Sequence, residues 1–178
     1  MNGIGFFDLG QAASLLVRLY SLTKDREILE AIRRAVRPLW SSNITRAYFN
    51  HQYLWLEEYP FESTSQGLFV LNGCLYALIG LIDVNTIDPQ LYLSELIDQI
   101  LHSLHQMLPY YVHPTISNWS LYDLSHLTMA SQLNPASYSY HLVHITLLQC
   151  LSEIFRKTNF SLSEVFDFYA RKFLSAIV

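Results

Sequence analysis

Three short groups of polar side chains interrupt an otherwise apolar sequence and carry the residue types that acid–base chemistry needs. The first is EEYP at residues 57–60, with Asn72 further on. The second is YDLSH at residues 122–126, and the third is YSYHLVH at residues 138–144. Carboxylates, tyrosines and histidines can exchange protons with a bound molecule without a cofactor. The sequence therefore favours a proton-transfer site built from these groups.

Two adjacent carboxylates, Glu57 and Glu58, lie within a run of large apolar and aromatic residues. Burial of a carboxylate without a partner is costly, so such groups normally stay in water. Two interpretations remain open from the residues alone. The pair forms a surface turn between helices, or one carboxylate acts as a catalytic group in a partly dry cleft.

Other chemistries receive less support from the spacing of their residues. His141 and His144 stand three apart on one helical face, but a zinc site needs a third ligand and no HExxH motif is present, so we predict no metal. A Ser-His-Asp triad lacks the GxSxG motif that would support it. Cys74 and Cys150 lie in apolar runs without CxxC spacing and are expected to be buried free thiols.

Helical periodicity accounts for most of the chain that must position these groups. Apolar residues at spacings of three and four predict an all-α domain of six or seven helices, joined as antiparallel hairpins in a single domain over residues 1–178. Pro38 is expected to end the second helix, and Asp88-Pro89 to begin the fourth. An irregular stretch at 41–65 includes a short extended piece at about 47–55. The expected helices cover about 9–22, 26–38, 67–82, 88–107, 138–156 and 162–176.

The composition limits the classes of partner. Charged residues make up only 15% of the chain while 51% is hydrophobic, which predicts an extended apolar cleft or a face covered by other protein. The net charge of −4 and the lack of a basic stripe argue against nucleic acid as a partner. No targeting signal is recognisable at the start of the chain, and the apolar run at 67–82 is too short to span a bilayer.

Five separated motifs resemble the C-terminal catalytic domain of D-glucuronyl C5-epimerases. In chain order they are GQAASLLVRLYSLTKD, EEYP with FVLNGCLYALIGL, MLPYY, LYDLSH, and YHLVHITLLQCLS. This family converts D-glucuronate to L-iduronate within heparan sulfate and heparin precursor chains. The resemblance implies part of an α/α-barrel, or toroid, of helical hairpins. The chemistry would be removal of the C5 proton and its return on the opposite face, without a cofactor in this domain.

The resemblance also assigns roles to residues. It implies Glu58, Tyr59, Tyr122 and Tyr140 as the catalytic groups, with Glu58 and Tyr140 on opposite faces of the sugar and their individual roles left open. Apolar surroundings would raise the pKa of Glu58, while Glu57 would be its solvated neighbour. The expected substrate contacts are Asn72, His126, His141 and His144. For His141 and His144 the alternative role is to support the residues that touch the substrate.

The chain departs from the family pattern at positions where arginine would bind a uronate carboxylate. Ser125 replaces the arginine of YDLRH, and ASYSYH, with Ser137 and Ser139, stands where the family tends to show ARWDYH. Arginine holds a carboxylate bidentately and stays charged. Two alternatives therefore accompany the epimerase hypothesis: a non-catalytic helical domain that binds polysaccharide or a partner protein, and a uronate polysaccharide lyase, which begins with the same proton abstraction.

The resemblance implies properties of a longer protein. Family members carry a membrane anchor and β-rich regions before this domain, so the chain is expected to be a C-terminal fragment. The whole protein would be a type II membrane protein of the Golgi lumen and a homodimer that acts on N-sulfated heparosan or heparan sulfate. Calcium would belong to the missing N-terminal region and not to this domain.

Overall fold

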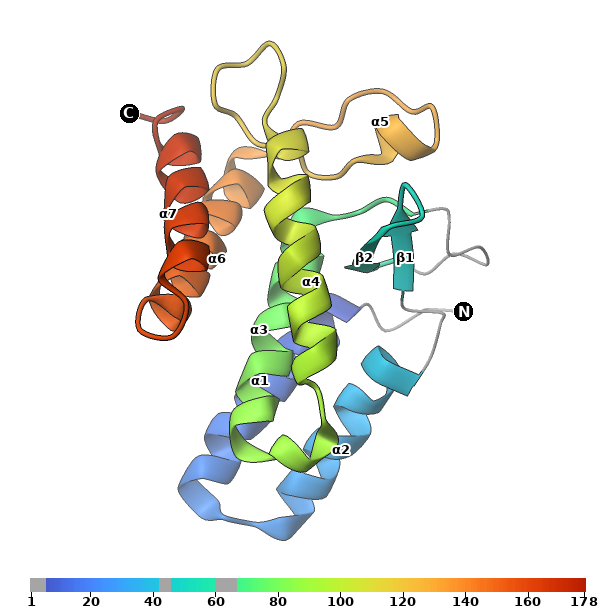
Figure 1. Ribbon diagram of the computed structural model, residues 1–178, viewed down its shortest axis with the longest axis vertical. Helices are drawn as coiled ribbons and strands as arrows, with labels where there is room; N and C mark the ends of the chain where they lie inside the picture. Colours follow the sequence, from blue (N-terminus) through green and yellow to red (C-terminus); the bar gives the residue numbers. More distant parts are fainter. Residues whose placement is uncertain (1–5, 42–45, 60–66) are drawn as a thin grey trace.

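The computed structural model describes residues 6–41, 46–59 and 67–178, and within them the chain is mostly α-helical. One two-stranded antiparallel sheet accompanies the helices (Figure 1). The all-α prediction is confirmed, whereas closure into a barrel stays a prediction. The elements are α1 (Phe6–Thr23), α2 (Arg26–Ser41), β1 (Arg46–Phe49), β2 (Tyr53–Leu56), α3 (Leu71–Ile87), α4 (Ser94–Met107), α5 (Ser125–Thr128), α6 (Tyr138–Phe155) and α7 (Phe160–Leu174), with 3₁₀ turns at Pro89–Leu91 and Leu108–Tyr111.

Helix α3 forms the centre of the molecule and is buried on nearly all sides, as its continuous apolar sequence requires. Helices α1, α4 and α6 pack against it. Two glycines let α1 approach α3 backbone to backbone. A Cβ on Gly10 would lie 2.5 Å from the Tyr76 carbonyl oxygen, and a Cβ on Gly80 would lie 2.6 Å from the Gly10 carbonyl oxygen. The GQA segment of α1 is therefore fixed against the middle of α3.

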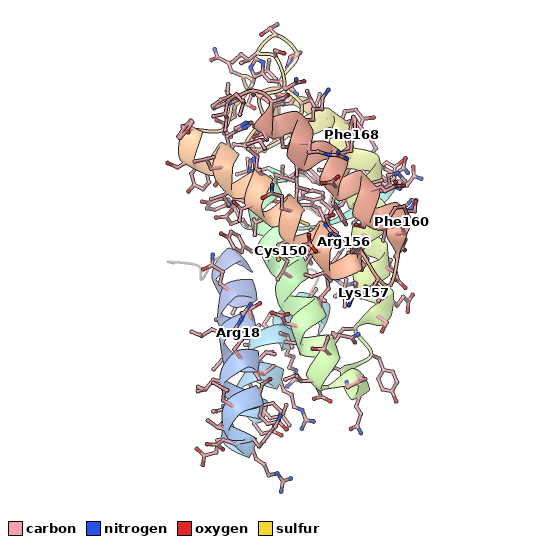
Figure 2. All side chains as sticks on the ribbon, turned by 90° about the vertical axis from the view of Figure 1, so that its left-hand side faces the viewer. Arg18, Cys150, Arg156, Lys157, Phe160 and Phe168 are labelled. Atoms are coloured by element: carbon pink, nitrogen blue, oxygen red, sulfur yellow. The ribbon has the colours of Figure 1, made fainter. Side chains whose placement is uncertain are left out.

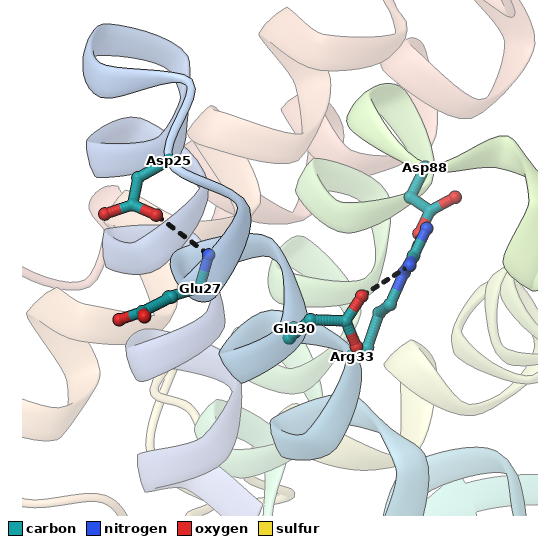
Figure 3. Close-up of polar contacts among 5 residues, drawn as sticks. All are labelled: Asp25, Glu27, Glu30, Arg33 and Asp88. Atoms are coloured by element: carbon teal, nitrogen blue, oxygen red, sulfur yellow. Dashed lines mark hydrogen bonds and ion pairs between the residues drawn. The ribbon is translucent and has the colours of Figure 1, made fainter.

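Helix α2 is held at its start and at its middle by polar contacts (Figure 3). The Asp25 carboxylate accepts a hydrogen bond from the Glu27 backbone N–H at 2.8 Å, which caps the first turn. Arg33 donates to Glu30 at 2.8 Å and to the buried carboxylate of Asp88 at 2.7 Å. The second contact ties the middle of α2 to the residue that ends α3.

Helices α6 and α7 form a second antiparallel hairpin, with Arg156 and Lys157 at its turn (Figure 2). The same view shows Cys150 on α6 and Arg18 on α1, which line one surface groove. Both cysteines are free thiols, as expected. Cys74 is buried, but Cys150 is exposed, so its predicted burial is wrong. Its apolar neighbours along α6 face the core while Cys150 faces outward.

Several predicted helix ends are wrong for identifiable reasons. Pro38 lies inside α2, which continues to Ser41 and thereby buries Leu39. Residues 67–70 precede α3 instead of beginning it, because Phe69 has a left-handed φ of 55°. Asp88-Pro89 starts only a 3₁₀ turn, which ends at the left-handed Tyr92, and α4 follows from Ser94. The extended piece near 47–55 is confirmed as β1 and β2.

No helix within the described ranges is both long enough and apolar enough to cross a bilayer. His102 and His105 are both exposed on α4.

Candidate active site

The stretch at residues 67–71, which leads into α3 and which we call the 67–71 segment, connects two of the three polar groups that the sequence singled out, the EEYP region and the YDLSH loop. Its Gly67 carbonyl accepts from the Thr128 hydroxyl, and its Leu68 carbonyl accepts from the Leu124 N–H. Its Leu71 N–H donates to the Tyr122 carbonyl at 3.1 Å. These contacts fix the YDLSH loop beside the start of α3.

On its other side the 67–71 segment is bonded to β2, to Glu57 that follows it, and to the 3₁₀ turn after α4. The Phe69 N–H donates to Glu57 Oε1 at 2.8 Å, and the Val70 carbonyl accepts from Trp55 Nε1 at 3.3 Å. The Tyr111 hydroxyl donates to the Phe69 carbonyl oxygen. Nearly every backbone polar group of this buried segment is thus used to join motifs that are distant in sequence.

Glu57 is the buried member of the carboxylate pair, which corrects the prediction that it is solvated. Only 1% of its surface is exposed, and its Oε2 makes no hydrogen bond to any described residue. Burial raises the pKa of Glu57 to about 8, although the N–H groups of Phe69 and Leu68 act in the opposite direction. The chain buries it because β2 continues directly into Glu57 with its side chain turned toward the 67–71 segment.

Glu58 is less buried and lies over the first turn of α3. A Cβ on Gly73 would stand 2.8 Å from Glu58 Oε2, so the glycine leaves the space that this carboxylate occupies. The positive end of a helix dipole favours a negative charge at such a place. The raised pKa predicted for Glu58 stays a prediction. Pro60, the last residue of EEYP, lies outside the described residues.

Three tyrosines from three separate segments converge beside Glu58. Glu58, Tyr122 and Tyr140 lie close enough to Tyr59 to shift its pKa, and Tyr140 also shifts the pKa of Tyr122. The rings of Tyr122 and Tyr140 meet edge to face, with centroids 4.8 Å apart. We call Glu58, Tyr59, Tyr122 and Tyr140 the tyrosine–carboxylate cluster. The structure therefore brings together the four residues predicted as catalytic, while their catalytic role stays a prediction.

The electrostatics of the cluster are governed by the negative charge of Glu58. This charge is the main reason that the pKa of Tyr59 is raised. The pKa of Tyr122 is also raised, first by burial and then by the Glu58 charge. Both hydroxyls therefore stay protonated at neutral pH and can donate hydrogen bonds. Tyr59 and Tyr140 remain 49% and 43% exposed, so a large ligand can reach the cluster from solvent.

Asn72 and His126 each carry a buried polar atom, and their contact with substrate stays a prediction. Asn72 is buried in the first turn of α3, next to Gly73, and its Oδ1 has no hydrogen-bond partner among the described residues. His126 lies half-buried on α5, and its Nδ1 is likewise buried without a partner there. Each residue therefore has a polar atom that a bound sugar could satisfy.

His141 and His144 are fully buried, which removes them from direct contact with solvent or with a surface ligand. The Ser120 hydroxyl lies 2.8 Å from Nδ1 of each ring. Nε2 of His141 donates to the Phe173 carbonyl of α7, and its ring stacks on Trp119. Burial lowers the pKa of His144 to about 3 and also lowers that of His141, so both rings are neutral.

The two histidines therefore fit the second role predicted for them, which was support of the site. They hold the start of α6, where Tyr140 lies, against the strand-like residues before YDLSH. The Ser137 hydroxyl caps α6 by accepting from the Tyr140 N–H at 3.3 Å. Sequence reasoning missed Ser120, because a single serine in NWSLY carries no spacing signal.

Ser125, at the position where the related family has arginine, is locked into a polar network. It is 6% exposed, and its hydroxyl donates to Asp123 Oδ1 at 2.7 Å while also contacting the Ser131 hydroxyl. Asn134 donates to the other oxygen of Asp123 at 2.7 Å. The carboxylate of Asp123 is therefore satisfied by neutral donors.

Among the residues that the structure describes, no three His, Cys, Asp or Glu side chains come close enough to hold a metal ion.

Comparison with known proteins gives the same family that the motifs indicated. The family model described as D-glucuronyl C5-epimerase C-terminus matches residues 4–174. D-glucuronyl C5-epimerase of Caenorhabditis elegans is 31% identical over 160 residues, which cover 82% of this chain and 25% of that protein. The chain thus spans about a quarter of the length of this curated relative. We conclude that the chain belongs to the D-glucuronyl C5-epimerase family.

Proposed function

We propose that the tyrosine–carboxylate cluster inverts C5 of D-glucuronate residues to L-iduronate in heparan sulfate or heparin precursor chains. The observation that carries this proposal is the convergence of Glu58 with Tyr59, Tyr122 and Tyr140, which come from three separate segments. Membership of the epimerase family supports the reaction type, since the C. elegans relative is named for it.

The reaction begins with a weakly acidic proton. The C5–H bond breaks, the proton moves to a base on one face of the ring, and the electron pair is delocalised into the neighbouring carboxylate. Glu58 suits the part of the base, because it carries the negative charge that raises the pKa of Tyr59 and lies at the positive end of α3.

Inversion is complete when a new C5–H bond forms on the opposite face. Tyr140 supplies this proton in our assignment, and Tyr122 and Tyr59 connect it to Glu58 through their hydroxyls. Hydroxyls that stay protonated also stabilise the charge that develops on the uronate carboxylate. Asn72 and His126 would contact the sugar, while His141 and His144 support Tyr140 from behind.

Proton exchange in deuterated water tests this function. N-sulfated heparosan incubated with the protein should gain deuterium at C5 and acquire iduronate signals in its NMR spectrum. Ultraviolet absorbance from an unsaturated uronate would instead show a lyase. Binding of the polymer without exchange or elimination would show the non-catalytic alternative.

One observation favours that non-catalytic alternative, namely the neutral network around Ser125. A uronate carboxylate loses its bidentate partner where Ser125 replaces arginine. Replacement Ser125→Arg should lower the KM for N-sulfated heparosan about tenfold if the missing cation limits the reaction. Gln149→Arg, which adds the same charge at an exposed position of α6, is the control. A KM that is the same in both variants and in the unmodified protein would contradict this explanation.

The proposal extends to the longer protein through family membership alone. There we propose a homodimer in the Golgi lumen with a type II membrane anchor, which acts on heparan sulfate chains. This region would need no cofactor, and any calcium would bind in the N-terminal region.

A further inference from the structure

Phe69 adopts a backbone conformation that its bulky side chain does not favour. Its φ of 55° lies in the left-handed region, where residues with a Cβ are uncommon. Such a conformation persists only where the surroundings hold it. The Phe69 ring is fully buried and packs edge to face on Phe49.

Two side chains hold the backbone of Phe69 from opposite sides. Its N–H donates to Glu57 Oε1 at 2.8 Å, and its carbonyl accepts from the Tyr111 hydroxyl. The space for the Glu57 carboxyl exists because position 67 is a glycine, since a Cβ on Gly67 would lie 2.5 Å from Glu57 Oε1. The strained residue is thus fixed by hydrogen bonds that use buried side chains.

Glu57 and Glu58 are consecutive, yet their side chains lie against different parts of the fold. Glu57 is directed into the core at the 67–71 segment, whereas Glu58 lies against Gly73 in the first turn of α3. The backbone between them has little freedom once Glu57 is bonded to Phe69. The place of Glu58 beside Tyr59 and Gly73 therefore depends on the Glu57 contact.

We propose that Glu57 is a positioning residue, which fixes Glu58 and Tyr59 against the start of α3 by holding the strained Phe69 backbone. It acts through hydrogen-bond geometry and does not touch the substrate. The inference rests on the proposed function only for its effect on rate; its structural part stands alone.

A neutral carboxyl is sufficient for this role. Burial keeps Glu57 protonated near neutral pH, and Oε1 can accept the Phe69 N–H in that form. A glutamine has the same shape and presents the same acceptor. Glu57→Gln should therefore preserve the arrangement, whereas Glu57→Ala should release it.

Kinetics and amide exchange together test this role. In Glu57→Ala, kcat for C5 exchange should fall about tenfold to a hundredfold with a KM changed less than twofold, because reacting groups are misplaced. Amide exchange of the 67–71 segment should become faster. Glu57→Gln should stay within about threefold of the unmodified kcat. Glu164→Gln, which changes an exposed glutamate on α7, should match the unmodified protein.

Titration of Tyr59 gives a readout that does not need activity. Tyrosine labelled with ¹³C at Cζ, assigned with Tyr59→Phe, reports its pKa by NMR. The Glu58 charge raises this pKa, so displacement of Glu58 in Glu57→Ala should bring it back toward the ordinary value. The pKa should stay raised in Glu57→Gln.

Several outcomes would overturn the proposal. One is a folded Glu57→Ala protein in which both the pKa of Tyr59 and the amide exchange of the 67–71 segment are unchanged. Another is a Glu57→Gln variant whose kcat falls as far as that of Glu57→Ala. If Glu57→Ala does not fold, Tyr111→Phe takes its place, since it removes the other hydrogen bond to Phe69 and keeps the ring. An unchanged Tyr59 pKa in that variant would then reject the role. Lack of C5 exchange by the unmodified protein would reject the proposed function, while the titration still decides the role of Glu57.

Discussion

The ring of Tyr122 meets the ring of Tyr140 edge to face, with centroids 4.8 Å apart, although one residue lies in a loop and the other in the first turn of α6. Tyr140 lies close enough to Tyr122 to raise its pKa, and Tyr122 in turn shifts the pKa of Tyr59. Tyr140 is 43% exposed, and in our proposal it is the tyrosine that exchanges a proton with a bound sugar.

Replacement Tyr140→Phe should lower kcat for C5 exchange at least a hundredfold, since it removes the proton but keeps the ring contact. Tyr138→Phe provides the control, because Tyr138 lies two residues earlier on α6 and is 58% exposed. Deuterium incorporation measured by NMR distinguishes the two variants. Equal losses in both would show that the hydroxyl of Tyr140 has no special part in the reaction.

Replacement Glu58→Gln should lower the pKa of Tyr59, because the Glu58 charge is the main cause that raises it. The pKa of Tyr122 should fall less, since burial is its main cause. Titration of ¹³C-labelled tyrosines would measure both values. Glu95→Gln, on the exposed side of α4, should leave both unchanged; a Tyr59 pKa that does not move in Glu58→Gln would exclude a charge on Glu58.

The buried Glu57 predicts a decline of stability with rising pH. Its pKa is about 8 in the folded state against 4.5 ordinarily, so between these values the folded state keeps a proton that the unfolded state has lost. The free energy of unfolding should therefore fall from about pH 4.5 to pH 8, by at most about 5 kcal/mol for a pKa difference of about 3.5. Nearby Asp123 and Glu58 act in the same direction.

Urea unfolding at pH 5, 7 and 9 would measure this decline. Glu57→Gln cannot titrate and should flatten it, so that the variant is more stable than the unmodified protein at pH 9. In the control Glu164→Gln, the free energy of unfolding should decline with pH as it does in the unmodified protein. If the free energy of unfolding depends on pH in the same way in Glu57→Gln and in the unmodified protein, groups other than Glu57 cause the decline.

The close contact between α1 and α3 predicts that one added methyl group lowers the stability of the protein. Gly80→Ala places a Cβ about 2.6 Å from the Gly10 carbonyl oxygen, which is backbone and cannot rotate away. The free energy of unfolding should fall by about 1–3 kcal/mol, although alanine favours helices. Chemical denaturation would measure it, with Gln149→Ala on the exposed face of α6 as control. A stabilised Gly80→Ala protein would mean that the two helices lie further apart.

The helices could be predicted because their apolar residues repeat at the helical period, and α6 and α1 follow that pattern almost to their ends. The end of α2 and the start of α3 could not be predicted from this period. Burial of Leu39 carries α2 past Pro38, and the bonds of Phe69 to Glu57 and Tyr111 delay α3. Each of these is a tertiary contact that overrides a local signal.

The site was likewise predictable in part, because its motif residues could be named from the sequence and its tertiary contacts could not. Motif resemblance named Glu58 and the three tyrosines that the fold brings together, but it took Glu57 for a surface neighbour. Leu54, Trp55, Leu56 and Glu57 are all buried, because α4 covers one face of β2 and the 67–71 segment lies against the other. A sequence pattern of alternate residues shows one buried face, and it cannot show that both are covered.

The hydrogen bonds of the 67–71 segment also set the order in which the protein can assemble. Its partners Tyr111 and Thr128 stand 42 and 61 residues away in the chain from Phe69 and Gly67. Closure of such long loops is slow, and their contacts form only when most of the chain has collapsed. The tyrosine–carboxylate cluster therefore has no local folding unit of its own. In refolding experiments its ability to exchange protons should return with the last kinetic phase, after the helical signal has recovered.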